Sequence, residues 1–193
     1  GKRKKIWNKN CLSIGLASGF MEPLESTSIH LIQSTIMRFF SLFPHKADFE
    51  VEMNYFNNSI DEEFKSIRDF LVLHYKLTTR DDSELWNYCR NMEIPDSLKE
   101  KLELYKSGSW IERNNKELFG VDSWLAVLNG QSAQANSYNP LVDTLPESEL
   151  EKIMQDTREV LSQCASSMPD HEDFILKNCA SKNSQLAKNQ IAP

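Results

Sequence analysis

The sequence predicts a mainly α-helical fold with about one strand at the N-terminus. Apolar residues recur at spacings of three and four in several stretches between residues 24 and 179, which is the pattern of amphipathic helices. A single short apolar run, 6–15, has the length and glycine ending of a strand. With 193 residues, 40% of them hydrophobic and 26% charged, the chain is long enough for one good core or two small ones.

The first elements are a strand and a helix joined by a glycine-containing turn. Residues 6–15, "IWNKNCLSIG", are expected to form one buried strand, whose backbone N–H and C=O groups need partners. This need favours a sheet upstream of the chain. Gly15 and Gly19 allow a tight turn, and Pro23 suits the first turn of a helix. Apolar residues at helical spacing extend that helix over about 24–43.

The other helices are predicted from their periodicity and their terminal residues. The most regular covers about 49–74, with acids and lysines on the face opposite the apolar one. Asp96 and Gly108 are a plausible N-cap and terminator of another. Shorter helices are expected over 82–92, 96–108, 122–131, 146–168 and 171–179. The polar tail, 181–193, is expected to be disordered.

Charge and cysteine content exclude several classes. A net charge of −6 argues against a nucleic-acid surface, and the basic run "GKRKK" at 1–5 is interpreted as a solvated terminus. No signal peptide is visible, and no apolar stretch reaches the roughly 18 residues that span a bilayer, so no membrane partner is expected. Four widely spaced cysteines without a CxxC motif predict neither disulfides nor a zinc site and favour the cytoplasm: Cys11, Cys89, Cys164 and Cys179.

The start of the helix at about residue 24 is the best candidate for chemistry. In "GFMEPLESTSIHLIQ", residues 19–33, two acids flank Pro23 and three hydroxyl residues follow. Helix N-termini carry unpaired N–H groups and a partial positive charge, so the N–H groups of Thr27 and Ser28 could bind a halide, a phosphate or a flavin carbonyl. The alternative, that these residues only cap the helix and complement its dipole, stays open.

Other chemistry-bearing patterns are weak. The four histidines form no ligand pair, so no metal is expected. GxSxG, P-loop and GxGxxG motifs do not occur in the sequence. Aromatic residues that include Tyr105, Trp110 and Phe119 could line a pocket for a flat substrate, and packing in the core is the alternative for them.

Residues 10–27, "NCLSIGLASGFMEPLEST", resemble the flavin-dependent tryptophan halogenase family. That family carries a run close to N-C-x-x-I-G-L-x-x-G-F-x-E-P-L-E-S-T near the end of its FAD-binding fold. The resemblance covers roughly residues 1–180 and continues in "FLVLHYKLTTRDDSELWNYCRNMEIPDSL", "SWLAVLNGQ" and "MPDHEDFI". It implies the helical C-terminal part of a flavoprotein-monooxygenase-like (α+β) halogenase fold. Residues 1–43 would be its last strand and its flavin- and chloride-side helix, and 44–180 its helical substrate-side domain.

The resemblance implies an enzyme that oxidises chloride or bromide with reduced FAD and O2 and halogenates an electron-rich aromatic substrate. A separate flavin reductase would supply the reduced FAD, and a homodimer is compatible with the family. Glu25, as a buried carboxylate, would stabilise the cationic intermediate or take its proton. Ser26 would lie between the flavin and substrate sites. The backbone N–H groups of Thr27 and Ser28 would bind the halide.

Two further expectations concern the cofactor and the chain's extent. Gly15 and Gly19 would allow a close approach to the flavin ring. The family's GxGxxG fingerprint, its WxWxIP segment and its catalytic lysine have no counterpart here, and the sequence opens on Gly1. We therefore expect a piece of a longer protein that is inactive alone. The alternative is a non-catalytic helical interaction module or a decayed halogenase remnant.

The substrate side departs from the family pattern. Family members that act on free tryptophan clamp it with paired tyrosines, an acid and a Phe-Trp pair, whereas residues 105–120 here read "YKSGSWIERNNKELFG". An indole- or tryptophan-like aromatic other than free tryptophan is therefore expected. Tyr105, Trp110 and Phe119 are the candidate pocket residues. Glycine often stands in the family where this chain has Ser28, whose side chain could crowd the halide.

Overall fold

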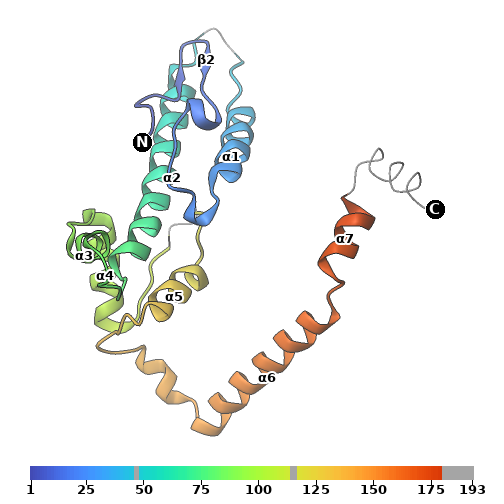
Figure 1. Ribbon diagram of the computed structural model, residues 1–193. Helices are drawn as coiled ribbons and strands as arrows, with labels where there is room; N and C mark the ends of the chain where they lie inside the picture. The colour runs from blue at the N-terminus through green and yellow to red at the C-terminus, as the bar shows by residue number, and fades with distance from the viewer. Residues whose placement is uncertain (46–47, 114–116, 180–193) are drawn as a thin grey trace. The chain divides into compact units, whose positions relative to one another are not determined.

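The computed structural model describes residues 1–45, 48–113 and 117–179 (Figure 1). In this part of the chain the elements are helices and one two-stranded antiparallel sheet, which confirms the mainly α prediction. No helix among the described residues is long and apolar enough to cross a membrane.

The chain divides into two compact units, Gly1–Asn139 and Pro140–Pro193, and each is described by itself. The boundary expected at residue 43 separates a flavin- and chloride-side part from a substrate-side part. It is a functional division, whereas the boundary after Asn139 separates two compact units. The expected disordered tail, 181–193, lies outside the described residues.

The helices lie within a few residues of their predicted positions, with one exception at α1. The first unit holds α1 (Ser28–Ser41), α2 (Glu50–Lys76), α3 (Glu84–Asn91), α4 (Asp96–Gly108) and α5 (Val121–Gly130). The second unit holds α6 (Glu147–Ser167) and α7 (His171–Asn178). Short 3-10 turns span Gly15–Ala17, Pro23–Glu25 and Pro140–Thr144.

The predicted N-terminal strand is a small hairpin instead. β1 (Trp7–Asn8) pairs antiparallel with β2 (Cys11–Leu12), so that Trp7 faces Leu12 across the ladder. Lys9 turns the chain at a φ of 52°, within the polar stretch that separates the two apolar halves. The predicted strand therefore pairs with itself.

The free edge of β1 is satisfied by one side chain of α2. Asn57 Oδ1 accepts hydrogen bonds from the Ile6 and Trp7 N–H groups at 2.9 and 3.0 Å, and its Nδ2 donates to the Trp7 carbonyl at 2.8 Å. These bonds account for backbone groups that would otherwise need another strand. This segment therefore finds partners for these backbone groups within the chain.

Two hydrophobic clusters hold the first unit together, and α2 contributes to both. In one cluster the Trp7 ring stacks on Phe49 at 5.4 Å and meets Phe39 and Phe56 edge-on at 5.1 and 5.5 Å. Each such side chain contributes roughly 1.5–3 kcal/mol on burial. The second cluster joins α2 to α4 and α5 and consists of Phe70, Leu73, Leu98, Leu102, Tyr105, Trp124 and Leu128. Figure 1 shows α1 and the hairpin beside one half of α2.

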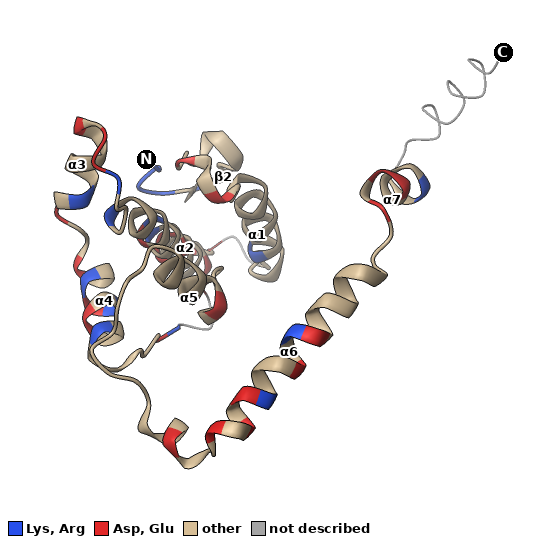
Figure 2. Ribbon diagram, turned by 60° about the horizontal axis from the view of Figure 1, so that its bottom comes forward, with Lys and Arg blue, Asp and Glu red and all other residues tan. Residues whose placement is uncertain are grey.

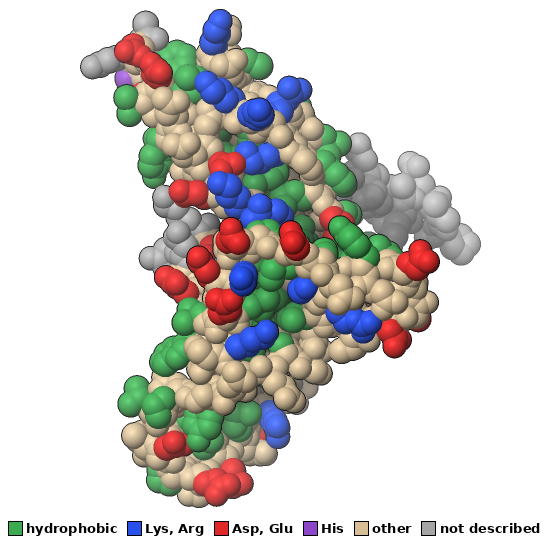
Figure 3. Space-filling model, turned by 90° about the vertical axis from the view of Figure 1, so that its left-hand side faces the viewer, with side chains coloured by type: hydrophobic (Ala, Val, Ile, Leu, Met, Phe, Trp, Pro, Cys, Tyr) green, Lys and Arg blue, Asp and Glu red, His purple; other side chains and the backbone are tan. Residues whose placement is uncertain are grey.

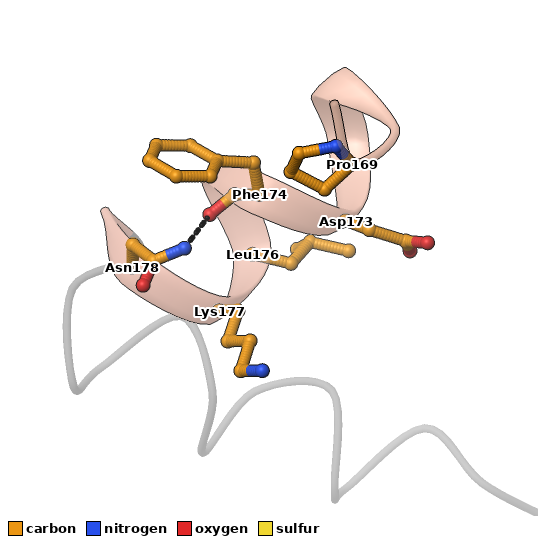
Figure 4. A pocket seen from close by; sticks show the side chains of 6 residues that line it. All are labelled: Pro169, Asp173, Phe174, Leu176, Lys177 and Asn178. Atoms are coloured by element: carbon orange, nitrogen blue, oxygen red, sulfur yellow. Dashed lines mark hydrogen bonds between the residues drawn. The ribbon is translucent and has the colours of Figure 1, made fainter. Parts of the chain in front are cut away.

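The second unit is built from helices whose described residues are all exposed. α6 carries its acidic and basic residues between Glu147 and Glu159 and none in its last turns (Figure 2), and its apolar side chains, such as Leu161 at 65% exposure, are unburied. Asp170 caps α7 by accepting hydrogen bonds from the N–H groups of Glu172 and Asp173. A hollow of about 660 Å³ lies along α7. Its lining side chains spread away from one another, so they do not form a convergent site (Figure 4).

Candidate functional site

A left-handed residue separates the E-P-L-E run from the helix that follows it. Pro23–Glu25 form a 3-10 turn, closed by a bond of 2.9 Å from the Ser26 N–H to the Pro23 carbonyl. Ser26 has φ 53° and ψ 35°, a conformation that costs a non-glycine residue about 1–2 kcal/mol. A right-handed helix cannot continue through such a residue. α1 therefore begins at Ser28 and not near residue 24 as predicted.

The start of α1 has no side-chain cap. Thr27 is the N-cap residue and is only 4% exposed, but its hydroxyl makes no capping hydrogen bond, and the first turn contains no acid. Arg38 is the only Lys, Arg, Asp or Glu of this helix (Figure 2). The capping alternative is therefore not what the structure shows. The first N–H groups of the helix lack intrahelical partners and point to where an anion would be favoured.

The Glu25 carboxylate lies against the last turn of α2. Its Oε1 is 3.0 Å from His74 Nε2. The other ring nitrogen of His74, Nδ1, lies 2.8 Å from the Phe70 carbonyl oxygen. The Glu25 side chain is 34% exposed in this chain, so the expectation of a buried carboxylate is not met here. Its position is set by the contact with His74 and not by enclosure.

The second acid of the same run is held by the next residue of α2. The Tyr75 hydroxyl donates a hydrogen bond to the Glu22 carboxylate. Burial raises the pKa of Tyr75, and the charge and hydrogen bond of Glu22 raise that pKa further. The two acids that flank Pro23 are thus anchored by neighbouring residues. The available signal for these anchors in the sequence was the His-Tyr pair inside the family-like stretch "FLVLHYKLTTRDDSELWNYCRNMEIPDSL".

Both candidate flavin-side glycines also have explanations within the chain. Gly15 has a φ of 63°, which favours glycine, and an added Cβ would only touch Ile32 at 3.4 Å. A Cβ on Gly19 would come within 2.8 Å of the Lys2 backbone, because the two residues form an antiparallel bridge. Their contact with a flavin remains a prediction.

The three candidate pocket residues lie in different environments. Tyr105 is 5% exposed, and its hydroxyl donates to the Ala133 carbonyl at 3.3 Å inside the second cluster. Phe119 stacks on Phe70 with ring centroids 3.9 Å apart. Trp110 is 48% exposed and lies against Gly108, where a Cβ would meet its indole nitrogen at 2.6 Å. Tyr105 and Phe119 thus have packing roles whatever else they do.

A buried carboxylate that sequence reasoning missed joins α1 to α2. Glu63 is 6% exposed, and its two oxygens lie 3.0 Å from His30 Nε2 and 2.8 Å from Arg38 Nη1. Its place on the apolar face of α2, between Ile60 and Ile67, was the only sequence signal. These contacts fix the direction of the helix whose start is the candidate anion site.

The N-terminal basic run is partly paired and not simply solvated. Lys2 and Lys65 lie 2.5 and 2.7 Å from the two oxygens of Asp61, and their hydrogen bonds hold the pKa of that carboxyl below its usual value. Lys and Arg side chains gather on the upper part of the face shown in Figure 3. Among the residues that the structure describes, no group of His, Cys, Asp and Glu has the arrangement of a metal site.

Comparison with known families identifies the family of the chain. Residues 1–147 match the family model for tryptophan halogenase. The chain belongs to the tryptophan halogenase family. The tryptophan 6-halogenase ThaL of Streptomyces albogriseolus is 40% identical over 108 residues, which are 56% of this chain and 20% of that protein. The 7-chloro-L-tryptophan 6-halogenase KtzR of Kutzneria sp. (strain 744) is 28% identical over 181 residues, which are 92% of this chain and 35% of that protein.

Solved halogenase structures share the fold of this part. BrvH, a flavin-dependent halogenase from Brevundimonas sp. BAL3, aligns with a TM-score of 0.84 and 36% identity over 92% of this chain. Xcc4156, a flavin-dependent halogenase from Xanthomonas campestris, aligns with a TM-score of 0.87 and 38% identity over 93% of this chain. In both cases the match covers 36% of the relative's chain. The chain therefore has the fold of the helical part of a flavin-dependent halogenase and spans about a third of such a protein.

Proposed function

We propose that this chain is the C-terminal part of an FAD-dependent halogenase that halogenates an electron-rich, indole- or tryptophan-like aromatic substrate with chloride or bromide. The observation that carries the proposal is the break at Ser26. It ends the 3-10 turn that bears Glu25 and leaves the start of α1 without a cap. An anion site and a carboxylate therefore lie on either side of one left-handed residue.

The chain's own residues would bind the halide and accept a proton. Reduced FAD, when bound, supplies with O2 the oxidising power that converts the halide into hypohalous acid. The N–H groups of Thr27 and Ser28 would hold the halide, since the helix dipole favours an anion there. A carbon of the aromatic ring would then form a bond to the halogen as the halogen–oxygen bond of hypohalous acid breaks and hydroxide leaves, and the positive charge would be delocalised over the rest of the ring. The Glu25 carboxylate would stabilise that cation and take the proton from the same carbon, which restores aromaticity.

The residues present fit the halide more directly than the flavin. The uncapped helix start offers donors for a small anion, whereas Gly15 and Gly19 have explanations within the chain. Gly15 and Gly19 are the proposed flavin-side residues, and Ser26 is a proposed catalytic residue between the flavin and substrate sites. Tyr105, Trp110 and Phe119 are the proposed substrate-side residues. In this proposal residues 1–43 form the flavin and halide side and 44–180 the substrate side.

Partners and compartment follow from the proposed reaction. Reduced FAD would come from a separate flavin reductase, and a homodimer is compatible with the proposal. The structure has free thiols at Cys11, Cys89, Cys164 and Cys179. These support a reducing compartment such as the cytoplasm.

The test is halogenation by the whole protein that contains this chain. It is incubated with FAD, NADH, a flavin reductase, and chloride or bromide, and products from indole, substituted indoles and free tryptophan are detected by mass spectrometry. Halogenated indoles that require both FAD and halide are expected, with free tryptophan a poor substrate. A protein that binds no FAD and yields no product with either halide would instead support the non-catalytic module or remnant.

A companion prediction concerns the 193-residue chain by itself. It should give no halogenated indole when supplied with the same reductase system, because the family's dinucleotide-binding glycine motif and catalytic lysine have no counterpart in it. Purified chain is assayed beside the whole protein at equal concentration. Halogenated product from the isolated chain would overturn the proposal that dinucleotide binding and the catalytic lysine are supplied by the rest of the protein.

A further inference from the structure

The contacts of His74 connect the Glu25 carboxylate to the rigid part of α2. Nε2 of the ring faces the Glu25 carboxylate at 3.0 Å, and Nδ1 faces the Phe70 carbonyl at 2.8 Å. Both oxygens are hydrogen-bond acceptors, so the ring satisfies both only with a hydrogen on each nitrogen. In that form the imidazole carries a positive charge and forms a charge-assisted bond with Glu25.

The base of this arrangement is well packed. The His74 ring meets the Phe70 ring edge-on at 4.9 Å, and Phe70 is only 2% exposed. Phe70 in turn stacks on Phe119 and meets Trp124 edge-on at 5.1 Å. Since Phe70 supplies both the carbonyl and the ring that hold His74, the imidazole has little freedom to turn. The ring therefore holds the Glu25 carboxylate in a fixed position relative to the packed part of α2.

The Glu25 side chain needs such support because it is not enclosed. It is one-third exposed and is the last residue of a 3-10 turn, and a free glutamate side chain has up to about 2 kcal/mol of rotamer entropy to lose. The second anchor, from Tyr75 to Glu22, fixes the other end of the same turn. Within the described residues, Oε1 of Glu25 is the oxygen engaged by His74. Among the described residues, the second carboxylate oxygen has no hydrogen bond or ion pair.

We propose that His74 is a positioning residue that holds one oxygen of Glu25 so that the other can accept the proton released by the substrate carbon. The Tyr75–Glu22 hydrogen bond is the second anchor of the same turn. This inference rests on the proposed halogenase function and deepens it. His74 itself takes no part in bond making, and the proton passes from the substrate carbon to the free oxygen of Glu25.

Two substitutions of His74 distinguish its hydrogen bond to Glu25 from its hydrogen bond to the Phe70 carbonyl. In His74→Asn the amide nitrogen lies near the place of Nδ1 and can still donate to the Phe70 carbonyl, but the side chain is too short to reach Glu25. In His74→Gln the amide nitrogen reaches the place of Nε2 and can donate to Glu25. The variants are made in the whole protein and assayed with FAD, a flavin reductase, halide and the indole substrate found for the wild type.

We expect His74→Asn to lower kcat by about 10- to 100-fold with little change in KM, because a misplacement of about 1 Å costs rates of that order. Hypohalous acid formation, measured with monochlorodimedone as a trap, should be unchanged, because halide oxidation does not use Glu25. His74→Gln should recover most of the kcat. Glu25→Gln combined with His74→Asn should be no slower than Glu25→Gln alone, since the two residues act on the same step.

The outcomes distinguish this inference from the proposed function. A wild-type protein that halogenates no indole overturns both. A halogenating wild type with an equally active His74→Asn variant overturns the positioning role alone. Equal losses of kcat in His74→Asn and His74→Gln also overturn it. They would show that the His74 ring acts only by packing and not through its hydrogen bond to Glu25. Independently of activity, the melting-temperature shifts of Glu25→Gln and His74→Asn should be non-additive, and additive shifts would contradict the contact.

Discussion

At the scale of single residues, Ser26 decides the geometry of the candidate site. Its left-handed conformation turns the chain between Glu25 and the helix, so the carboxylate projects toward α2 while the helix start stays uncapped. Strain of this kind persists only where the surroundings impose it. The contacts of Glu22 and Glu25 with the end of α2 supply that constraint on the turn before Ser26.

Replacing Glu25 tests the proposed proton acceptor. Glu25→Gln in the whole protein should lower kcat by about 10²-fold, since the charge that stabilises the cationic transition state is removed. FAD binding and the folded state should survive. Steady-state halogenation assays and flavin titration provide the measurements. Glu22→Gln is the matched control, because its amide oxygen still accepts from Tyr75, and a loss as large as that of Glu25→Gln would contradict the assigned role.

Backbone conformation at Gly15 gives a second prediction at this scale. Gly15→Ala should lower the free energy of unfolding by about 1–2 kcal/mol, because φ there is 63° while the added Cβ meets Ile32 at an ordinary 3.4 Å. Gly130→Ala, at the last residue of α5 and with open space around the new methyl group, should stabilise by up to about 1 kcal/mol. Urea unfolding of both variants measures the difference. Effects of the same sign would refute the backbone explanation.

At the scale of elements, α2 is the helix that contacts β1, α1 and the turn that bears Glu25. Its first half binds the edge of β1 through Asn57, its middle binds α1 through Glu63, and its last turn binds Glu22 and Glu25. Because one continuous helix carries all these contacts, their mutual distances depend on a single rigid element. α1 and the Glu25 carboxylate are therefore held in fixed positions relative to the same helix.

The buried carboxylate of Glu63 allows a test of the contact between α1 and α2. Glu63→Gln should destabilise the protein by about 2 kcal/mol, because it weakens charged hydrogen bonds to His30 and Arg38 at a site that is only 6% exposed. Glu62→Gln, the exposed neighbour, should change stability by less than about 0.5 kcal/mol. Chemical denaturation monitored by circular dichroism compares the two, and equal effects would argue against a network that holds α1.

At the scale of the whole molecule, the two units differ in how they are stabilised. The first has two buried clusters and several ion pairs between distant segments. In the second, the described residues of α6 and α7 are exposed, so those helices take no stability from packing within the unit. The free energy of unfolding of the protein, and its change with pH, should therefore depend mainly on the first unit.

The prediction at this scale concerns acid stability. The pKa of Asp61 is lowered by hydrogen bonds from Lys2 and Lys65, so the charged carboxylate stabilises the folded state. This contribution is complete above the unfolded-state pKa and is lost as pH falls through the lower folded-state pKa. Asp61→Asn should cost about 0.2–1 kcal/mol at pH 7, since the side chain is 33% exposed.

Once the pH is below the lowered folded-state pKa of Asp61, the Asp61→Asn variant and the wild type should converge, because both then lack the charge. Free energies of unfolding measured across pH 2–7 check this convergence. Asp156→Asn, at an exposed acid of α6, is the control and should follow the wild type throughout. A gap between Asp61→Asn and the wild type that persists unchanged in acid would show that the ion pairs are not its source.

The sequence by itself determined the mainly helical architecture, the approximate positions of the helices, and the family-like run at residues 10–27. These are local properties, since helical periodicity and a short motif can be read from neighbouring residues. The start of α1 was predicted too early because the left-handed conformation of Ser26 has no signature in residue type. Nothing local marks a serine that the tertiary contacts force out of the right-handed region.

Only the tertiary structure decided which residues meet. The pairing of Glu25 with His74, the satisfaction of β1 by Asn57, and the burial of Glu63 join segments that are far apart in the chain. Such contacts leave no periodic pattern, because they depend on how the helices pack and not on the spacing of residues along any one of them. The chemistry of the site was therefore visible in residue types, whereas its geometry followed from the packing around α2.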